Sequence, residues 1–135
     1  MALVNNVTSS MLSALWPSWA RYGYATSDLT TYSAAAFAYV QNLLREQGVD
    51  PDTVVEDDSS HFNRVIGFKA LELLHQDLQT GAGGSADERF AEVQADYEER
   101  FNEAWPNISY RLMEDGNEDN ATTVDAGPLT RLGRA

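Results

Sequence analysis

Two histidines follow an acidic residue by three positions, a spacing that suits metal binding on a helix. Glu72 and His75 would share one helical face, and a Glu-x-x-His pair is half of the ligand set in di-iron four-helix bundles. Asp58 and His61 repeat the spacing, but they belong to the start of the same helix and not to an antiparallel partner. Because the other half of the set is missing, we interpret both histidines as exposed or hydrogen-bonded residues and expect no metal and no cofactor.

The acidic stretch from Met113 to Asn120 contains a glycine and superficially resembles a calcium-binding loop. Placing Gly116 at the sixth position of such a loop puts Arg111 and Met113 where carboxylates are required, so a solvated acidic turn is the better interpretation. The sequence also lacks cysteine, a G-x-S-x-G motif and a phosphate-binding glycine loop after a strand. We therefore expect that the protein is not an enzyme.

Length and charge narrow the remaining functions. The chain has 135 residues, enough for one domain with its own core, and no cysteine for a disulfide. Twenty-one acidic residues against nine basic ones give a net charge of −12, and such a surface repels a DNA backbone, so specific nucleic-acid binding is not expected. The opening MALVNNVTSS has no basic region and no apolar run of about 18 residues occurs, so we expect neither a secretion signal nor a membrane span.

Apolar residues recur at three- and four-residue steps in four segments, and each segment predicts a helix. The first is short, is capped by Thr8, Ser9 or Ser10 and ends near Leu15; the second runs from Thr26 or Ser27 to Gly48; the third runs from Ser59 to Gln79; the fourth begins at the Ser85–Glu88 capping box and ends at Pro106. Residues 80–84 are too rich in glycine to be helical and should make a tight connection between two antiparallel helices.

The fold class that follows is all-α, a small four-helix bundle of one short and three longer helices. We expect a bundle domain over residues 1–109 and an extended C-terminal arm over residues 110–135, where the EDGNEDN run and Gly127-Pro128 show no sustained periodicity. Such a tail is either disordered or becomes ordered on binding a partner.

Two groups of apolar residues suggest contact with other proteins. The third helix is apolar on two sides, with Phe68 and Leu71 away from its main apolar face, so it is either central in the bundle or contacts a partner with its second face. Trp16 and Trp19 flank Pro17 in a short segment and are either core residues or anchors in a partner surface.

Several features of the chain occur together in one known family. They are Leu15-Trp16-Pro17 at the end of a short helix, the helix entry Thr26-Ser27-Asp28-Leu29, the long helix from Phe62 to Asp77, the Tyr97-Glu98-Glu99-Arg100-Phe101 pattern, and an acidic, glycine-containing tail that ends in arginine. In these features the chain resembles the head-to-tail connector (adaptor) proteins, which dock beneath the portal ring of long-tailed bacteriophages and related viruses.

The resemblance implies a viral structural protein in the neck of the virion, assembled in the host cytoplasm. Its partners would be the portal protein, neighbouring copies in a ring, a dodecamer by resemblance, and the next tail-side connector or stopper protein. DNA would pass through the acidic lumen without specific binding. The resemblance also makes residues 110–135 an assembly arm, with Arg131 and Arg134 as anchors to acidic portal sites. The candidate partner-binding residues are Trp16, Trp19, Phe68, Leu71, Tyr110, Arg111, Leu129, Arg131, Leu132 and Arg134.

Two other classes of function remain open. A free-standing acidic helical protein-binding module would be monomeric or dimeric and would not need the C-terminal arm. A metal-binding bundle would need Glu72 and His75 together with further ligands that the sequence does not offer. Molecular mass at native concentration separates the first class from a ring, and metal content after purification tests the second.

Overall fold

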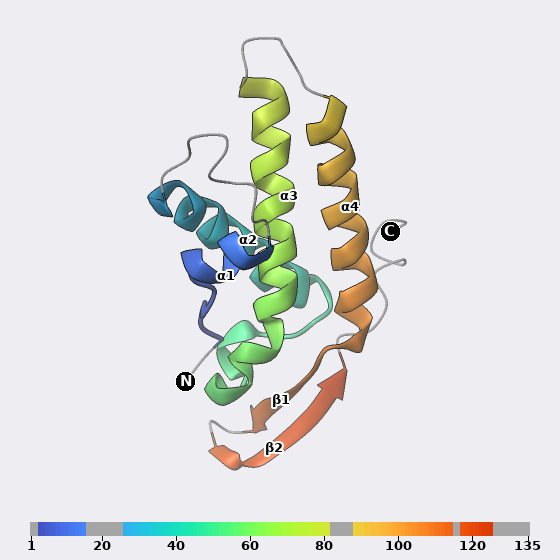
Figure 1. Ribbon diagram of the computed structural model, residues 1–135. Coiled ribbons are helices and arrows are strands. Elements are labelled where there is room, and N and C mark those ends of the chain that lie inside the picture. The colour runs from blue at the N-terminus through green and yellow to red at the C-terminus, as the bar shows by residue number, and fades with distance from the viewer. Residues whose placement is uncertain (1–2, 16–25, 82–87, 115–116, 126–135) are drawn as a thin grey trace.

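The helix that is apolar on two sides stands at the centre of the molecule (Figure 1). The structure is a computed structural model that describes residues 3–15, 26–81, 88–114 and 117–125. Within these ranges there are four α-helices, α1 (Ser9–Leu15), α2 (Thr26–Glu46), α3 (Asn63–Gly81) and α4 (Glu88–Ala104). The protein is therefore a small, mostly helical bundle, as the sequence predicts. No helix in the described part of the chain has both the length and the apolar character to cross a membrane.

Both apolar sides of α3 are buried. α3 packs against α2 and against α4, and α1 contacts both α2 and α3. Ile66 and Leu74 on the main face and Phe68 and Leu71 on the second face each expose no more than 3% of their surface. The sequence left open whether this helix is central in the bundle or contacts a partner with its second face. In the single chain it is central.

α3 and α4 run antiparallel and side by side, as Figure 1 shows. α3 continues through Thr80 to Gly81, so the prediction that these two residues are not helical is wrong. Adding a residue to an existing helix costs little, and glycine is tolerated at the C-terminal end. The first residues of the predicted third helix form a separate 3-10 turn, η3 (Glu56–Phe62). Ser85 and the rest of residues 82–87 lie outside the described residues.

The short helix α1 is held at both ends. The Met11 backbone N–H donates to Thr8 Oγ1 at 3.2 Å, which confirms Thr8 as the predicted cap. At the other end, the Tyr97 hydroxyl of α4 donates to the carbonyl oxygen of Leu15 at 2.9 Å. A Cβ atom at Gly67 would lie only 2.7 Å from Leu15 Cδ1, so the glycine in α3 allows α1 to approach closely.

A β-hairpin follows the last helix, and it is the main departure from the sequence-based prediction. After a 3-10 turn, η4 (Trp105–Asn107), β1 (Ser109–Glu114) and β2 (Asn117–Asp125) pair antiparallel, with Tyr110 opposite Val124. Figure 1 shows the hairpin at the end of the bundle where α4 finishes. The expectation of an extended, unpaired arm is wrong for the described residues between 110 and 125. Residues 126–135 lie outside the described part of the chain.

The hairpin is held to the bundle by its core contacts and by its inner edge. The Tyr110 ring is buried 5.2 Å from the ring of Phe62, centroid to centroid. On the edge away from β2, Leu112 forms a β-bridge with Val54, and the Val55 backbone N–H donates to the Arg111 carbonyl oxygen at 2.9 Å. The segment after α2 therefore also supports β1; it contains the short turn η2 (Pro51–Thr53).

Candidate functional site

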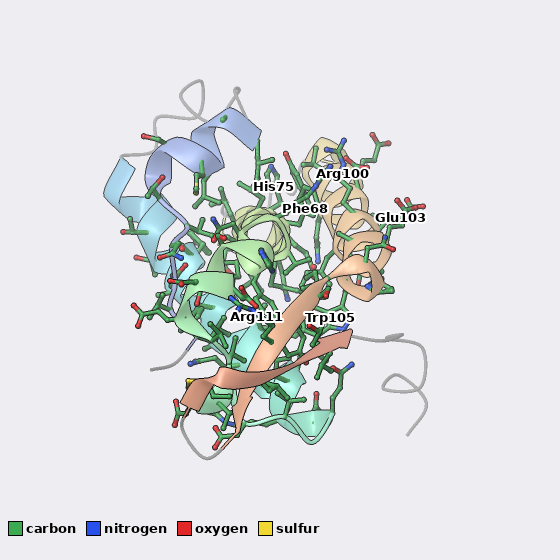
Figure 2. All side chains as sticks on the ribbon, turned by 90° about the horizontal axis from the view of Figure 1, so that it is seen from below. Phe68, His75, Arg100, Glu103, Trp105 and Arg111 are labelled. Atoms are coloured by element: carbon green, nitrogen blue, oxygen red, sulfur yellow. The ribbon has the colours of Figure 1, made fainter. Side chains whose placement is uncertain are left out.

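A groove of about 720 Å³ lies where the start of α3, the end of α4 and the start of β1 meet. Its floor is apolar and is formed by Val65, Phe68, Ala104 and Ile108. Its rim is polar and includes His61, Arg64, Arg100 and Glu103. Figure 2 shows Phe68 between α3 and α4, with Arg100 and Glu103 on the α4 side. An apolar floor with a few charged groups around it is the usual make-up of a binding site.

The two arginines of the groove are positioned by neighbouring aromatic rings. The Arg64 guanidinium carbon lies 5.4 Å from the centroid of the Phe68 ring, one turn further along α3. The Arg100 guanidinium carbon lies 5.5 Å from the Tyr97 ring on α4, and its Nη2 is 3.0 Å from Asp96 Oδ2. Both side chains of that ion pair are half exposed, so Arg100 can exchange Asp96 for another carboxylate at little cost.

His61 links the groove to the hairpin. Its Nδ1 lies 2.8 Å from the Ser109 carbonyl oxygen, at the first residue of β1. Because a carbonyl oxygen only accepts, Nδ1 carries the proton, and in the neutral ring Nε2 is the acceptor. This contact bears out the interpretation of His61 as a hydrogen-bonded residue.

Arg111 fastens β1 to the turn η3 and so fixes the hairpin beside the groove. Asp58 accepts three hydrogen bonds from Arg111, from the backbone N–H at 2.8 Å, from Nε at 3.0 Å and from Nη2 at 3.0 Å. The Asp58 side chain is buried, whereas Arg111 is 44% exposed. The hydrogen bonds from the Arg111 guanidinium lower the pKa of the Asp58 carboxyl below its usual value, although burial opposes this shift.

The Glu-x-x-His pair of α3 takes part in two separate structural interactions. Glu72 Oε1 accepts from Lys69 Nζ at 2.7 Å, and Nζ also lies 4.1 Å from the Tyr39 ring and 4.9 Å from the Phe101 ring. His75 is fully buried, and its Nδ1 donates to the Leu71 carbonyl oxygen at 2.7 Å. Burial lowers the pKa of His75. In the described ranges no three His, Cys, Asp or Glu side chains gather as a metal site would require.

The predicted partner-binding residues fall into three groups. Phe68 contributes to the groove floor, whereas Arg111 is partly exposed but does not line the groove. Leu71 and Tyr110 are buried in the core, so in this conformation neither offers surface to a partner. The remaining candidates, Trp16, Trp19, Leu129, Arg131, Leu132 and Arg134, lie outside the described residues.

The groove is a site that the sequence did not predict. Arg64 and Phe68 stand one helical turn apart, and Arg100 follows Tyr97 by three residues. Arginine–aromatic pairs at this spacing are common on exposed helices, so the pattern alone does not indicate a cavity. The groove depends on how the end of α4 meets η3 and β1, and the hairpin was not predicted.

Comparison with known proteins identified no relative of this chain. No protein-family model matches the chain, and neither the curated proteins nor the solved structures include a significant match.

Proposed function

We propose that the protein acts by binding other proteins, as a head-to-tail adaptor that forms a ring beneath a viral portal and lines the DNA channel. The observation that carries the binding role is the groove, an apolar floor bordered by arginines on a chain of net charge −12. The finer assignment to a portal rests on the resemblance of the sequence to the connector proteins.

The anchored hairpin supports this proposal. β1 is fixed to the bundle by Asp58 and Val54, and β2 pairs along β1 as far as Asp125. The last described residue, Asp125, is therefore held opposite Ser109, at the end of β1 that joins the bundle. A terminal segment that starts from a rigid support loses less conformational freedom when it docks on a partner. Such a segment suits the anchoring role that we propose for Arg131 and Arg134.

The charge of the chain supports passage of DNA. A ring of subunits that each carry −12 presents a lumen that repels phosphate, so DNA can slide without being held. The proposal includes no catalytic step.

The direct test mixes the purified chain with the portal protein from the same genome and observes complexes by pull-down and electron microscopy. The informative truncation ends after Asp125, because it keeps the paired strands; removal of the chain after Arg111 would strip β2 from β1 and damage the fold. We expect rings on the portal with the full chain and greatly reduced binding with the truncated chain. Circular dichroism of both chains checks that the fold is retained.

The opposite results distinguish the two candidate functions. If neither chain associates with the portal, the adaptor proposal fails. The full chain could instead bind an acidic protein segment in its groove and stay monomeric in the presence of the portal. That result would identify a free-standing acidic binding module, which is the alternative that the groove supports.

A further inference from the structure

We propose that the groove is the contact between neighbouring copies of the chain, and that it receives the acidic run 114–120 of the next copy. This inference rests on the proposed function, because it names the surface through which the ring would close. The groove supplies Arg64 and Arg100 on its rim. The run EDGNEDN supplies four carboxylates, from Glu114, Asp115, Glu118 and Asp119, among seven residues.

Charge selects this occupant. Among the described residues, Arg64 lies within ion-pair distance of no carboxylate and contacts the Phe68 ring instead. Arg100 is engaged only by an exposed, exchangeable partner, Asp96. The rim carries two arginines against one glutamate, Glu103, so its charge is positive on a chain whose net charge is −12. The C-terminal segment 126–135 carries Arg131 and Arg134 and has the wrong charge for this site.

The hairpin prevents the acidic run from reaching the groove of its own chain. Ser109, which lines the groove, is the first residue of β1, and Glu114 is the last. A strand rises about 3.3 Å per residue, so the run begins about 16 Å away from the groove along β1. The contact must therefore join two copies, with the turn of one copy in the groove of the next. Such a head-to-tail contact closes into a ring when the rotation between copies allows it.

Glu103 refines the expected contact. Glu103 on the rim repels the incoming carboxylates. Removal of its charge should therefore strengthen binding, a result that a general apolar contact would not produce.

The first experiment measures binding of a fluorescent peptide of residues 112–124 to the full chain by anisotropy at low salt. We expect saturable binding that weakens in high salt. The double variant R64E/R100E should weaken binding by about tenfold or more, and Glu103→Gln should strengthen it. A peptide with Gln or Asn in place of the four acidic residues should not bind.

The matched control is Arg45→Glu, which reverses a charge at the end of α2, away from the groove. It should change the peptide affinity by less than about twofold. The groove variants should keep the fold: Arg64 lies in the first turn of α3, where a carboxylate is favourable, and Arg100 is exposed. Circular dichroism checks this point.

The second experiment exchanges the charges between copies on the portal. The groove variant R64E/R100E and the run variant E118K/D119K should each fail to form a ring alone, because each places like charges together. Their equal mixture should form one, because each groove then faces a run of opposite charge. A chain that carries all four substitutions should also recover.

Absence of peptide binding to the wild-type chain at about 1 mM overturns the groove assignment, whatever the portal experiment gives. Rings that form normally with R64E/R100E alone also overturn it and leave the adaptor proposal in place. Peptide binding with the expected variants, combined with no ring on the portal, would overturn the adaptor role and keep the groove as a site for acidic segments.

Discussion

Asp58 joins two parts of the chain that are 53 residues apart in sequence, because it holds both the backbone and the side chain of Arg111. Hydrogen bonds to a buried carboxylate are stronger than those between neutral groups. The pair therefore ties β1 to the turn before α3, and it fixes the geometry of the groove between them.

Asp58→Asn should lower the free energy of unfolding by about 1–3 kcal/mol, because the amide keeps the shape but loses the charge that the guanidinium contacts. Chemical denaturation measures the loss. The control is Asp96→Asn, which breaks an ion pair whose side chains are both half exposed and should cost less than about 0.5 kcal/mol. Equal losses in the two variants would mean that the Asp58 contact has no special role.

The stability of the protein should fall as the pH drops below about 6.5, in part because of His75. Burial lowers the pKa of His75 in the folded state, so the unfolded chain takes up a proton at a higher pH than the folded chain does. His75→Phe removes this proton uptake and should flatten the dependence of unfolding free energy on pH between about 7 and 5.

Below about pH 4 a second decline should begin, because protonation of Asp58 removes the contribution of its lowered pKa. This second decline should be absent from Asp58→Asn. A His75→Phe chain with the same slope as the wild type would contradict the first assignment.

At the scale of elements, α1 is the helix with the least support of its own. It has seven residues, too few to be stable alone, and depends on its contacts with α2, α3 and α4. The Tyr97 hydroxyl matters here because it satisfies a carbonyl oxygen at the end of α1 that has no partner within the helix.

Tyr97→Phe should lower the free energy of unfolding by about 0.5–1.5 kcal/mol, because Leu15 loses its hydrogen bond while the ring packing is kept. Hydrogen exchange should show faster opening of α1 than of α3. Tyr39→Phe is the control. Because 43% of the Tyr39 surface is exposed, removal of its hydroxyl should leave the free energy of unfolding nearly unchanged. Unchanged exchange in α1 would show that the hydroxyl does not hold the helix.

The helices were largely predictable from the sequence, whereas the hairpin was not. Caps and apolar periodicity place α1 and α2 correctly, and Gly48 has the positive φ of 84° that ends the second helical segment. Asp115-Gly116 is a common two-residue hairpin signal, but it lies in an acidic run that is also typical of tails. β1 forms because Val54, Val55 and Asp58 meet it from a distant part of the chain, and no local pattern encodes that contact.

At the scale of the whole molecule, acidic charge dominates. Twenty-one acidic residues face nine basic ones, and three of the basic side chains, Lys69, Arg100 and Arg111, are paired with Glu72, Asp96 and Asp58. The remaining carboxylates repel one another across a domain of small radius. This repulsion opposes the folded state, and salt reduces it.

Raising the salt concentration from about 0.01 to about 0.15 M should therefore raise the melting temperature by about 3–5 °C. Differential scanning calorimetry measures the shift. A variant with Gln at Glu92, Glu98 and Glu99, which are exposed on α4, should melt higher at low salt and respond less to added salt. A melting temperature that falls with salt would show that attractive ion pairs outweigh the repulsion.

The burial of Tyr110 has a consequence for synthesis on the ribosome. Its ring completes a core that also contains Leu3, Leu12 and Phe62, so residues near both ends of the described chain must be present together. While the chain is being translated, Phe62 lacks the Tyr110 ring until β1 has emerged. Contacts of such long sequence separation form slowly and leave apolar surface open in the meantime. The nascent protein should therefore depend on chaperones until translation is nearly complete.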